Sequence, residues 1–184
     1  PIAAMHIQRA LNRGAKLIVI DPIKTEFASR ADIHLQLEPE HNIPVINALL
    51  YTIIEEGLVN EEFVRDHTIG IEYVKEAVKD YAPEVVAKYT RLNPEDIRAA
   101  ARMYATTKPA VITHGMGVTH FNHGVGGVCD VSNLFLMTGN ICELGTGDLP
   151  LRGQENVQGC CDMGVLPNIF PNLGSVTDPE QRAW

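Results

Sequence analysis

The polar segment from Leu151 to Gly164 gathers the side chains in this sequence that are best suited to binding an anion. Its residues, LRGQENVQGCCDMG, combine Arg152, Gln154 and Asn156 with three glycines and two adjacent cysteines. A guanidinium presents a rigid fork of donors that matches a carboxylate or a phosphate, and the amides both donate and accept hydrogen bonds. Glycines give such a segment room to pass tightly around a bulky ligand. The pattern predicts an anion-binding loop, and the alternative is a plain polar surface loop.

The glycine-rich turn HGMGVTH, from His114 to His120, is a second candidate, and Met116 lies inside it. A short apolar run precedes the turn and a helical pattern follows it, an arrangement that exposes backbone amides to a phosphate. Its glycines either admit a ligand closely or only make a tight turn. The spacing is not GxGxxG, which disfavours an ordinary NAD-binding domain. His123 and the two histidines that bound the turn lack a carboxylate or cysteine partner at a fixed helical spacing, which disfavours a metal site.

Two further polar residues lie where elements begin or end. Asp21 closes the apolar run AKLIVID, the position at which a nucleotide-binding sheet uses an acid to hold hydroxyls or base edges. A turn residue before Pro22 explains Asp21 equally well. Asn42 begins a helical pattern, where its side chain can cap the helix.

Composition and charge limit the classes of partner. The chain has 184 residues, 45% of them hydrophobic, which is enough for a substantial core. Its 23 acidic residues against 15 Lys and Arg give a net charge of -8, which repels a phosphate backbone, so nucleic acid is not expected as the main partner. No apolar run reaches the roughly 18 to 20 residues that span a bilayer, so no direct membrane insertion is expected.

The four cysteines show no CxxC pairing and no histidine at zinc-finger spacing, which disfavours a self-contained iron-sulfur or structural zinc site. The neighbours Cys160 and Cys161 are expected to be free thiols, because a disulfide between adjacent residues is strained. The low cysteine pairing favours a reducing, cytoplasmic compartment.

The elements that position these residues alternate between helices and short strands. Apolar periodicity and end signals predict helices over Ile2–Arg13, Asn42–Gly57, Asn93–Thr106 and Val125–Met137, and strands over Ala15–Asp21, Ile33–Leu37 and Pro109–His114. Charged segments between Asn60 and Thr90 predict small helices that cover a sheet edge. This order predicts an α/β fold with a doubly wound, mostly parallel sheet and helices on both faces. Ligands bind beyond the carboxyl ends of such strands, so Asp21 and the turns after Leu37 and His114 are expected on one edge.

With these elements in place, two motifs carry a family resemblance. TGN at Thr138 to Asn140, followed by LRGQENVQGCCDMGVLPNIFP, resembles the molybdopterin oxidoreductases, and more closely the catalytic alpha subunit of molybdenum- or tungsten-dependent formate dehydrogenases. AKLIVIDP, ADIHLQL and HGMGVTH occur in the same order and at similar spacing in that family. The resemblance implies that formate is oxidised to carbon dioxide at a metal held by bis-molybdopterin guanine dinucleotide. It also implies that the electrons pass on to iron-sulfur clusters.

The resemblance also implies roles for particular residues. Arg152 matches the family arginine beside the metal, which orients the formate carboxylate. Gly153 and Gln154 match positions that line the pterin, and Asn156 is grouped with them as cofactor-binding. The remaining cofactor-binding candidates are Asp21 and Asn42, which match guanine-nucleotide contacts, and Met116 and His120, which fall in the turn along the cofactor. No metal ligand is expected among them.

Three departures from the family pattern fall on expected guanine contacts and indicate a divergent branch. Ile23 stands where the family often has Arg, Glu40 and His41 stand where Gly-Ser or Gly-Thr precedes the Asn, and His120 stands where Gln is usual. The family's cysteine-bound [4Fe-4S] cluster, its Cys or selenocysteine metal ligand and the neighbouring His have no counterpart here. The resemblance therefore implies a fragment that is inactive alone.

The expected domains are residues 1–150, the second part of the nucleotide-binding-like domain, and residues 151–184, the opening of a neighbouring domain. The expected partners are formate and electron-transfer subunits, which carry iron-sulfur clusters or a hydrogenase or NAD-reducing module. Two alternatives stay open. One is a molybdopterin oxidoreductase that acts on nitrate or another oxyanion. The other is a non-catalytic electron-transfer scaffold related to the large subunit of respiratory NADH dehydrogenase.

Overall fold

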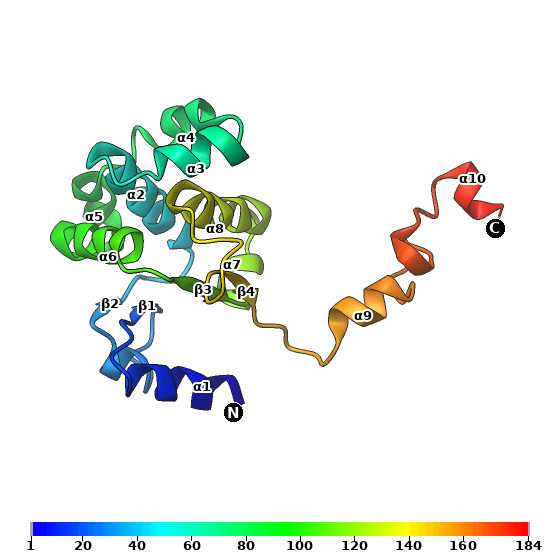
Figure 1. Ribbon diagram of the computed structural model, residues 1–184, viewed down its shortest axis with the longest axis horizontal. Helices are drawn as coiled ribbons and strands as arrows, with labels where there is room; N and C mark the ends of the chain where they lie inside the picture. The colour runs from blue at the N-terminus through cyan, green and yellow to red at the C-terminus, as the bar shows by residue number, and fades with distance from the viewer. Residues whose placement is uncertain (1, 184) are drawn as a thin grey trace. The chain divides into compact units, whose positions relative to one another are not determined.

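The computed structural model describes residues 2–183, whose contacts fall into two compact units, one ending at Leu149 and the other beginning at Pro150. The first unit alternates helices with short strands (Figure 1). Its elements are α1 (Ile2–Leu11), β1 (Ile18–Ile20), β2 (Ile33–Leu35), α2 (Asn42–Glu55), α3 (Glu61–His67), α4 (Ile71–Val78), α5 (Pro83–Thr90), α6 (Pro94–Thr106), β3 (Val111–His114), α7 (Met116–Thr119), α8 (Gly124–Thr138) and β4 (Gly147–Pro150), with a 3-10 turn at Ala28–Arg30.

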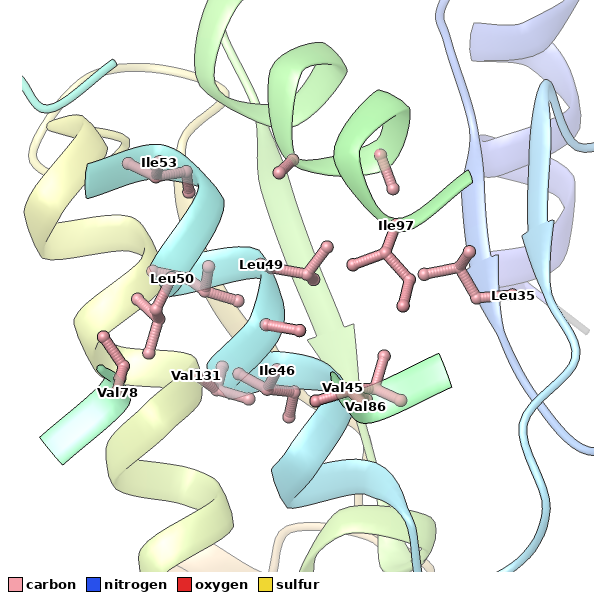
Figure 2. Packing of buried hydrophobic residues seen from close by; sticks show 14 of the residues in the cluster. Leu35, Val45, Ile46, Leu49, Leu50, Ile53, Val78, Val86, Ile97 and Val131 are labelled. Atoms are coloured by element: carbon pink, nitrogen blue, oxygen red, sulfur yellow. The ribbon is translucent and has the colours of Figure 1, made fainter. Parts of the chain in front are cut away.

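Helix α2 is the centre of the first unit. Its apolar side chains recur at helical spacing, and Leu50 and Ile53 are completely buried. They pack with residues from the surrounding helices, including Val86 of α5, Ile97 of α6 and Val131 of α8 (Figure 2). Burying each such side chain contributes about 1.5–3 kcal/mol, so this cluster provides most of the driving force for the unit.

The strands confirm the α/β class but form two separate pairs. β1 and β2 run parallel, with Ile18 opposite Ile33 and Ile20 opposite Leu35. β3 and β4 make a second two-stranded sheet. Among residues 2–183 these pairs do not join into one continuous sheet. Each strand has only three or four residues, which limits the ladder that it can offer to a further strand.

Several helix boundaries follow their local signals. Asn93 caps α6 as predicted: its side-chain oxygen accepts from the Glu95 amide at 3.1 Å, and Pro94 occupies the first turn. Gly57 ends α2 with a φ of 65°. The prediction that Asn42 caps α2 was wrong, because the helix begins at Asn42 itself and His41 occupies the cap position without a side-chain hydrogen bond.

The small helices between residues 60 and 90 are present, but their main contacts are with other helices rather than with a sheet edge. α4 and α5 pack against α2, α5 also packs against α6, and α3 packs against α8. Two arginines of α6 form ion pairs with the neighbouring helices: Arg98 pairs with Glu55 of α2 and Glu84 of α5, and Arg102 pairs with Glu56 at the end of α2.

The TGN motif closes α8 inside the first unit. Gly139 is left-handed, with a φ of 68°, and an added Cβ there would lie 2.6 Å from the side-chain nitrogen Nδ2 of Asn60. Asn140 is fully buried and its amide donates to Thr138 Oγ1 at 2.9 Å. The motif therefore has a packing role at the end of this helix.

The second unit contains α9 (Val157–Asp162), a 3-10 turn at Pro171–Leu173 and α10 (Pro179–Arg182). α9 packs against that turn, and Ile169 and Ser175 form an isolated antiparallel bridge. From residue 150 to residue 183 no side chain is fully buried, so this unit has no hydrophobic core of its own. Across both units, no described helix is long and apolar enough to cross a membrane.

Candidate functional site

The turn after β3 is short, helical and held by α2. Gly115 leads into α7, which carries Met116 at its start, and the chain then passes through His120. The Asn42 side chain donates to the Gly117 carbonyl at 2.6 Å. Two of the predicted cofactor-binding positions, Asn42 and the turn, are therefore brought together, although Asn42 contacts the turn instead of capping its own helix.

Met116 and His120 both lie on the surface of this turn. The Met116 side chain is 59% exposed, and His120 is also exposed. Neither side chain takes part in a side-chain hydrogen bond or ion pair with another described residue of the first unit. Both are free to contact a ligand, and their assignment to the cofactor stays a prediction.

The glycines of this region serve different purposes. A Cβ at Gly124 would lie 2.2 Å from the Thr119 carbonyl oxygen, and one at Gly127 would lie 3.2 Å from Val118 Cγ1. These two glycines are needed for the close packing of α7 on α8. A Cβ at Gly117 would meet no atom within 4 Å. Close approach of a ligand therefore remains as an explanation for Gly117 alone of the three.

Asp21 uses one carboxylate oxygen locally. Its Oδ1 accepts from the Ile23 amide at 2.7 Å, so the residue stabilises the turn that follows β1. Its backbone carbonyl is 3.0 Å from His34 Nε2. Among the described side chains and amides, none is hydrogen-bonded to Oδ2, which can accept from a ligand. The turn role and the ligand role are thus compatible at this residue.

An open pocket of about 560 Å³ lies at the carboxyl ends of β1 and β2. Its walls come from the two strand ends and from the turn between α5 and α6. Pro22, His34, Gln36, Arg91 and Asn93 are among the lining residues. The pocket lies where a parallel strand pair of an α/β protein binds its ligands.

Sequence reasoning missed His34, Gln36 and Arg91 as pocket residues. The alternation in β2 contained a usable signal, because His34 and Gln36 alternate with Leu35 and Leu37, which are 0% and 2% exposed. Arg91 had no local signal: it has a φ of 60° and pairs with Glu38 at 3.0 Å, a residue distant in sequence.

The other candidates, Arg152, Gly153, Gln154 and Asn156, lie in the second unit, in the loop before α9. Arg152 and Gln154 are exposed, and within residues 150–183 their side chains have no hydrogen-bond or ion-pair partner. Asn156 differs: it is left-handed, with a φ of 51°, and its side chain covers Gly159, where an added Cβ would lie 2.5 Å from Asn156 Oδ1. Asn156 therefore has a structural role at the start of α9, and its cofactor role stays a prediction.

The cysteines of the described chain form no disulfide. Cys160 and Cys161, both in α9, are free thiols as predicted, and so are Cys129 and Cys142. Within residues 2–183, no three His, Cys, Asp or Glu side chains gather to hold a metal ion. In the second unit, the unpaired guanidinium of Arg152 and the amide of Gln154 suit an anionic ligand. In the first unit, Gly117 leaves the backbone open and Asp21 has a free carboxylate oxygen that can accept from a donor.

A comparison with protein families identifies the family of this chain. The model of the molybdopterin oxidoreductase family matches residues 1–175, and the chain belongs to this family.

Individual proteins of this family are similar to the chain over nearly its whole length. The chain is 47% identical over 97% of its length to the alpha subunit of an F420-dependent formate dehydrogenase from Methanocaldococcus jannaschii. It is 46% identical over 99% of its length to formate dehydrogenase H from Escherichia coli. The chain spans 26% of the length of each of these relatives. Among solved structures, acetylene hydratase from Pelobacter acetylenicus matches 76% of the chain and 19% of its own with a TM-score of 0.73 and 32% identity.

Proposed function

We propose that this chain is part of the catalytic alpha subunit of a formate dehydrogenase, which oxidises formate to carbon dioxide with release of a proton and an electron pair. The observation that carries the proposal is identity of 47% and 46% to formate dehydrogenase subunits over nearly the whole chain. Membership of the molybdopterin oxidoreductase family implies a molybdopterin cofactor. Bis-molybdopterin guanine dinucleotide with molybdenum or tungsten would accept the electron pair when bound.

Arg152 is proposed to bind and orient the formate carboxylate. Its guanidinium is exposed and unpaired within the second unit, and its fork of donors matches a carboxylate bidentately. A preorganised positive charge lowers a reaction barrier by positioning the substrate and by stabilising charge as it develops. Gly153 and Gln154 are proposed to line the pterin, and Asn156 to support that loop from the start of α9.

The first unit is proposed to hold the guanine dinucleotide part of the cofactor. Asp21 offers its free Oδ2 to a donor of the nucleotide, and Asn42 holds the Gly117 turn from which Met116 and His120 project. The open pocket at the ends of β1 and β2, which begins at Pro22 immediately after Asp21, provides space for a polar ring. Asp21, the turn held by Asn42 and the pocket are thus all proposed to bind and position the cofactor.

The proposal includes partners outside this chain. Electrons would leave through a [4Fe-4S] cluster held elsewhere in the full-length protein and then through electron-transfer subunits with iron-sulfur clusters or a hydrogenase or NAD-reducing module. The first of the relatives above is named as the alpha subunit of an F420-dependent formate dehydrogenase, which implies that the enzyme has other subunits. Free cysteines support a reducing, cytoplasmic location.

The test is formate-dependent reduction of a viologen dye by the full-length protein under anaerobic conditions. Arg152→Lys keeps the charge and loses the fork, so formate turnover should fall roughly a hundredfold while metal content stays unchanged. Arg182→Lys is the matched control, because Arg182 is an exposed arginine of the same unit, in α10. Equal turnover in the two variants would remove Arg152 from the site.

The same assay separates the alternatives. Dye oxidation driven by nitrate, without formate activity, would keep the family and change the substrate, since a guanidinium binds any small anion. Inactivity with both substrates would favour the non-catalytic scaffold. The scaffold has no need for an unpaired Arg152 beside Gly153 and Gln154, which is why formate oxidation is preferred.

A further inference from the structure

Four polar side chains converge in the interior of the first unit, and one of them, His114, directly precedes the candidate turn. Tyr104 lies in the last turn of α6, His114 ends β3, Asn140 follows α8, and Asp148 belongs to β4. Each has a buried atom without a hydrogen-bond partner among the described residues: Tyr104 Oη, His114 Nδ1, Asn140 Oδ1 and Asp148 Oδ1. We refer to these four residues as the β3–β4 polar cluster.

The centre of the cluster is a buried pair between the two strands. His114 Nε2 lies 3.2 Å from Asp148 Oδ2, and the two side chains are only 6% and 18% exposed. The pair therefore ties β3 to β4 through side chains in addition to the backbone ladder. A carboxylate oxygen only accepts hydrogen bonds, so the hydrogen bond between His114 and Asp148 requires a hydrogen on Nε2 of the imidazole.

The other two members extend the cluster toward the helix ends. Burial raises the pKa of Tyr104 to about 12; neighbouring Thr138 and Asn140 oppose this rise and the charge of Asp148 adds to it. Tyr104 is therefore close to all three residues. Lys108 Nζ donates to the Thr138 carbonyl at 2.5 Å and closes the same region from the chain entering β3.

Such a group of buried polar atoms is not explained by packing alone. A buried polar atom without a partner destabilises the fold, and native proteins pair such atoms with protein groups or ordered water. Apolar residues would fill the same space at lower cost. Four polar side chains retained in one buried region indicate a hydrated network whose geometry matters to the protein.

Both strands of this pair lead directly to segments of the proposed site. His114 is followed at once by Gly115 and the turn that Asn42 holds. β4 ends at Pro150, and Arg152 follows two residues later in the sequence. A contact that fixes β3 against β4 therefore fixes the point at which the Gly115–His120 turn leaves the sheet.

We propose that His114 and Asp148 are positioning residues, which with Tyr104, Asn140 and bound water form a clamp that holds the Gly115–His120 turn of the first unit in its working conformation. The statement that the positioned turn binds the cofactor rests on the proposed function. The clamp itself rests on the 3.2 Å pair and on the four buried atoms.

The test uses the full-length holoenzyme with His114→Ala, Asp148→Ala and the double variant. Loss of positioning should lower kcat for formate about 10- to 100-fold in each single variant, with cofactor content unchanged. The double variant should be no worse than either single variant, because each removes the same contact. His114→Gln, which keeps a donor near the Nε2 position, should recover most of the activity. Asp66→Ala, which breaks the exposed pair with Arg65, is the control and should leave kcat unchanged.

Hydrogen exchange provides a readout that does not depend on the reaction. In Asp148→Ala, backbone amides of residues 115–120 and 147–149 should exchange faster, while those of α2 should not change. Activity in the single variants within twofold of wild type, or additive losses in the double variant, would refute the clamp. If the wild-type protein does not oxidise formate, the proposed function fails and exchange alone decides. Unchanged exchange in both segments then refutes the clamp as well.

Discussion

Arg98 allows the contribution of one side chain to the first unit to be predicted in detail. Its side chain is 16% exposed, and its guanidinium contacts three carboxylates: Glu55 of α2 at 2.5 Å, Glu56 just after α2 at 3.7 Å, and Glu84 of α5 at 3.0 Å. The hydrogen bond that Arg98 donates to Glu55 is the main cause that raises the pKa of Arg98 above its ordinary value. The arginine therefore stays charged and joins three helices at one point.

Replacing Arg98 with Met keeps the aliphatic stem and removes the charge. An exposed ion pair contributes at most about 1 kcal/mol, and a charge-assisted hydrogen bond to a buried group contributes about 1.5–3 kcal/mol. Arg98 lies between these limits, and its removal also leaves three carboxylates facing one another. We therefore expect the free energy of local unfolding of α2 and α6 to fall by about 2–3 kcal/mol.

The assay is hydrogen exchange of the full-length protein, followed by mass spectrometry of peptides from α2 and α6. A loss of about 2–3 kcal/mol should accelerate exchange roughly 30- to 160-fold, since about 1.4 kcal/mol corresponds to a factor of ten. Arg65→Met is the control, because Arg65 is 68% exposed and pairs only with its neighbour Asp66. Acceleration of less than about threefold, or equal to that of the control, would refute the reasoning.

Three further predictions concern pH and backbone packing. Burial raises the pKa of Asp130 in α8 to about 6, so ionisation of this carboxyl destabilises the fold as pH rises through that value. Replacing Asp130 with Asn should therefore slow hydrogen exchange of α8 by about tenfold at pH 8 and change it little at pH 4. The hydrogen bond from Arg102 lowers the pKa of Glu56. The contribution of Glu56 to the stability of the fold is therefore present above pH 4.5 and is lost as pH falls below that value. Hydrogen exchange of α2 between pH 6 and pH 3, corrected for the intrinsic rate, should show this loss in the wild type and not in Glu56→Gln. Gly124→Ala should separate α7 from α8 and speed exchange of residues 116–120, whereas Gly117→Ala, which meets no atom within 4 Å, should not; equal effects would contradict the packing argument.

Local patterns in the sequence were sufficient for the main elements. The apolar spacing of Ile46, Leu49, Leu50 and Ile53 predicted α2 because one face of a helix repeats every three to four residues. The Asn93-Pro94 start of α6 was readable because a cap and a first-turn proline act within a few residues. The α/β class followed from the alternation of such signals, and the LRGQENVQGCCDMG segment indicated the family that the comparison then showed.

Elements with weak local signals were not predicted. β4, with the sequence GDLP, contains glycine and proline and lacks alternation, and its strand conformation depends on its pairing with β3. α7 and α9 are each too short to show helical periodicity. In both cases tertiary contacts supply the stability that the local sequence lacks.

The sequence by itself thus determined the family, the α/β class and the central helix, because these depend on motifs and on periodicities within single elements. Only the tertiary structure decided which residues meet. Asn42 contacts Gly117 across 75 positions, and His114 pairs with Asp148 across 34. It also separated glycines that pack helices, such as Gly124, from Gly117, which is open. Long-range contacts of this kind depend on how the elements pack, and local composition contains no record of that packing.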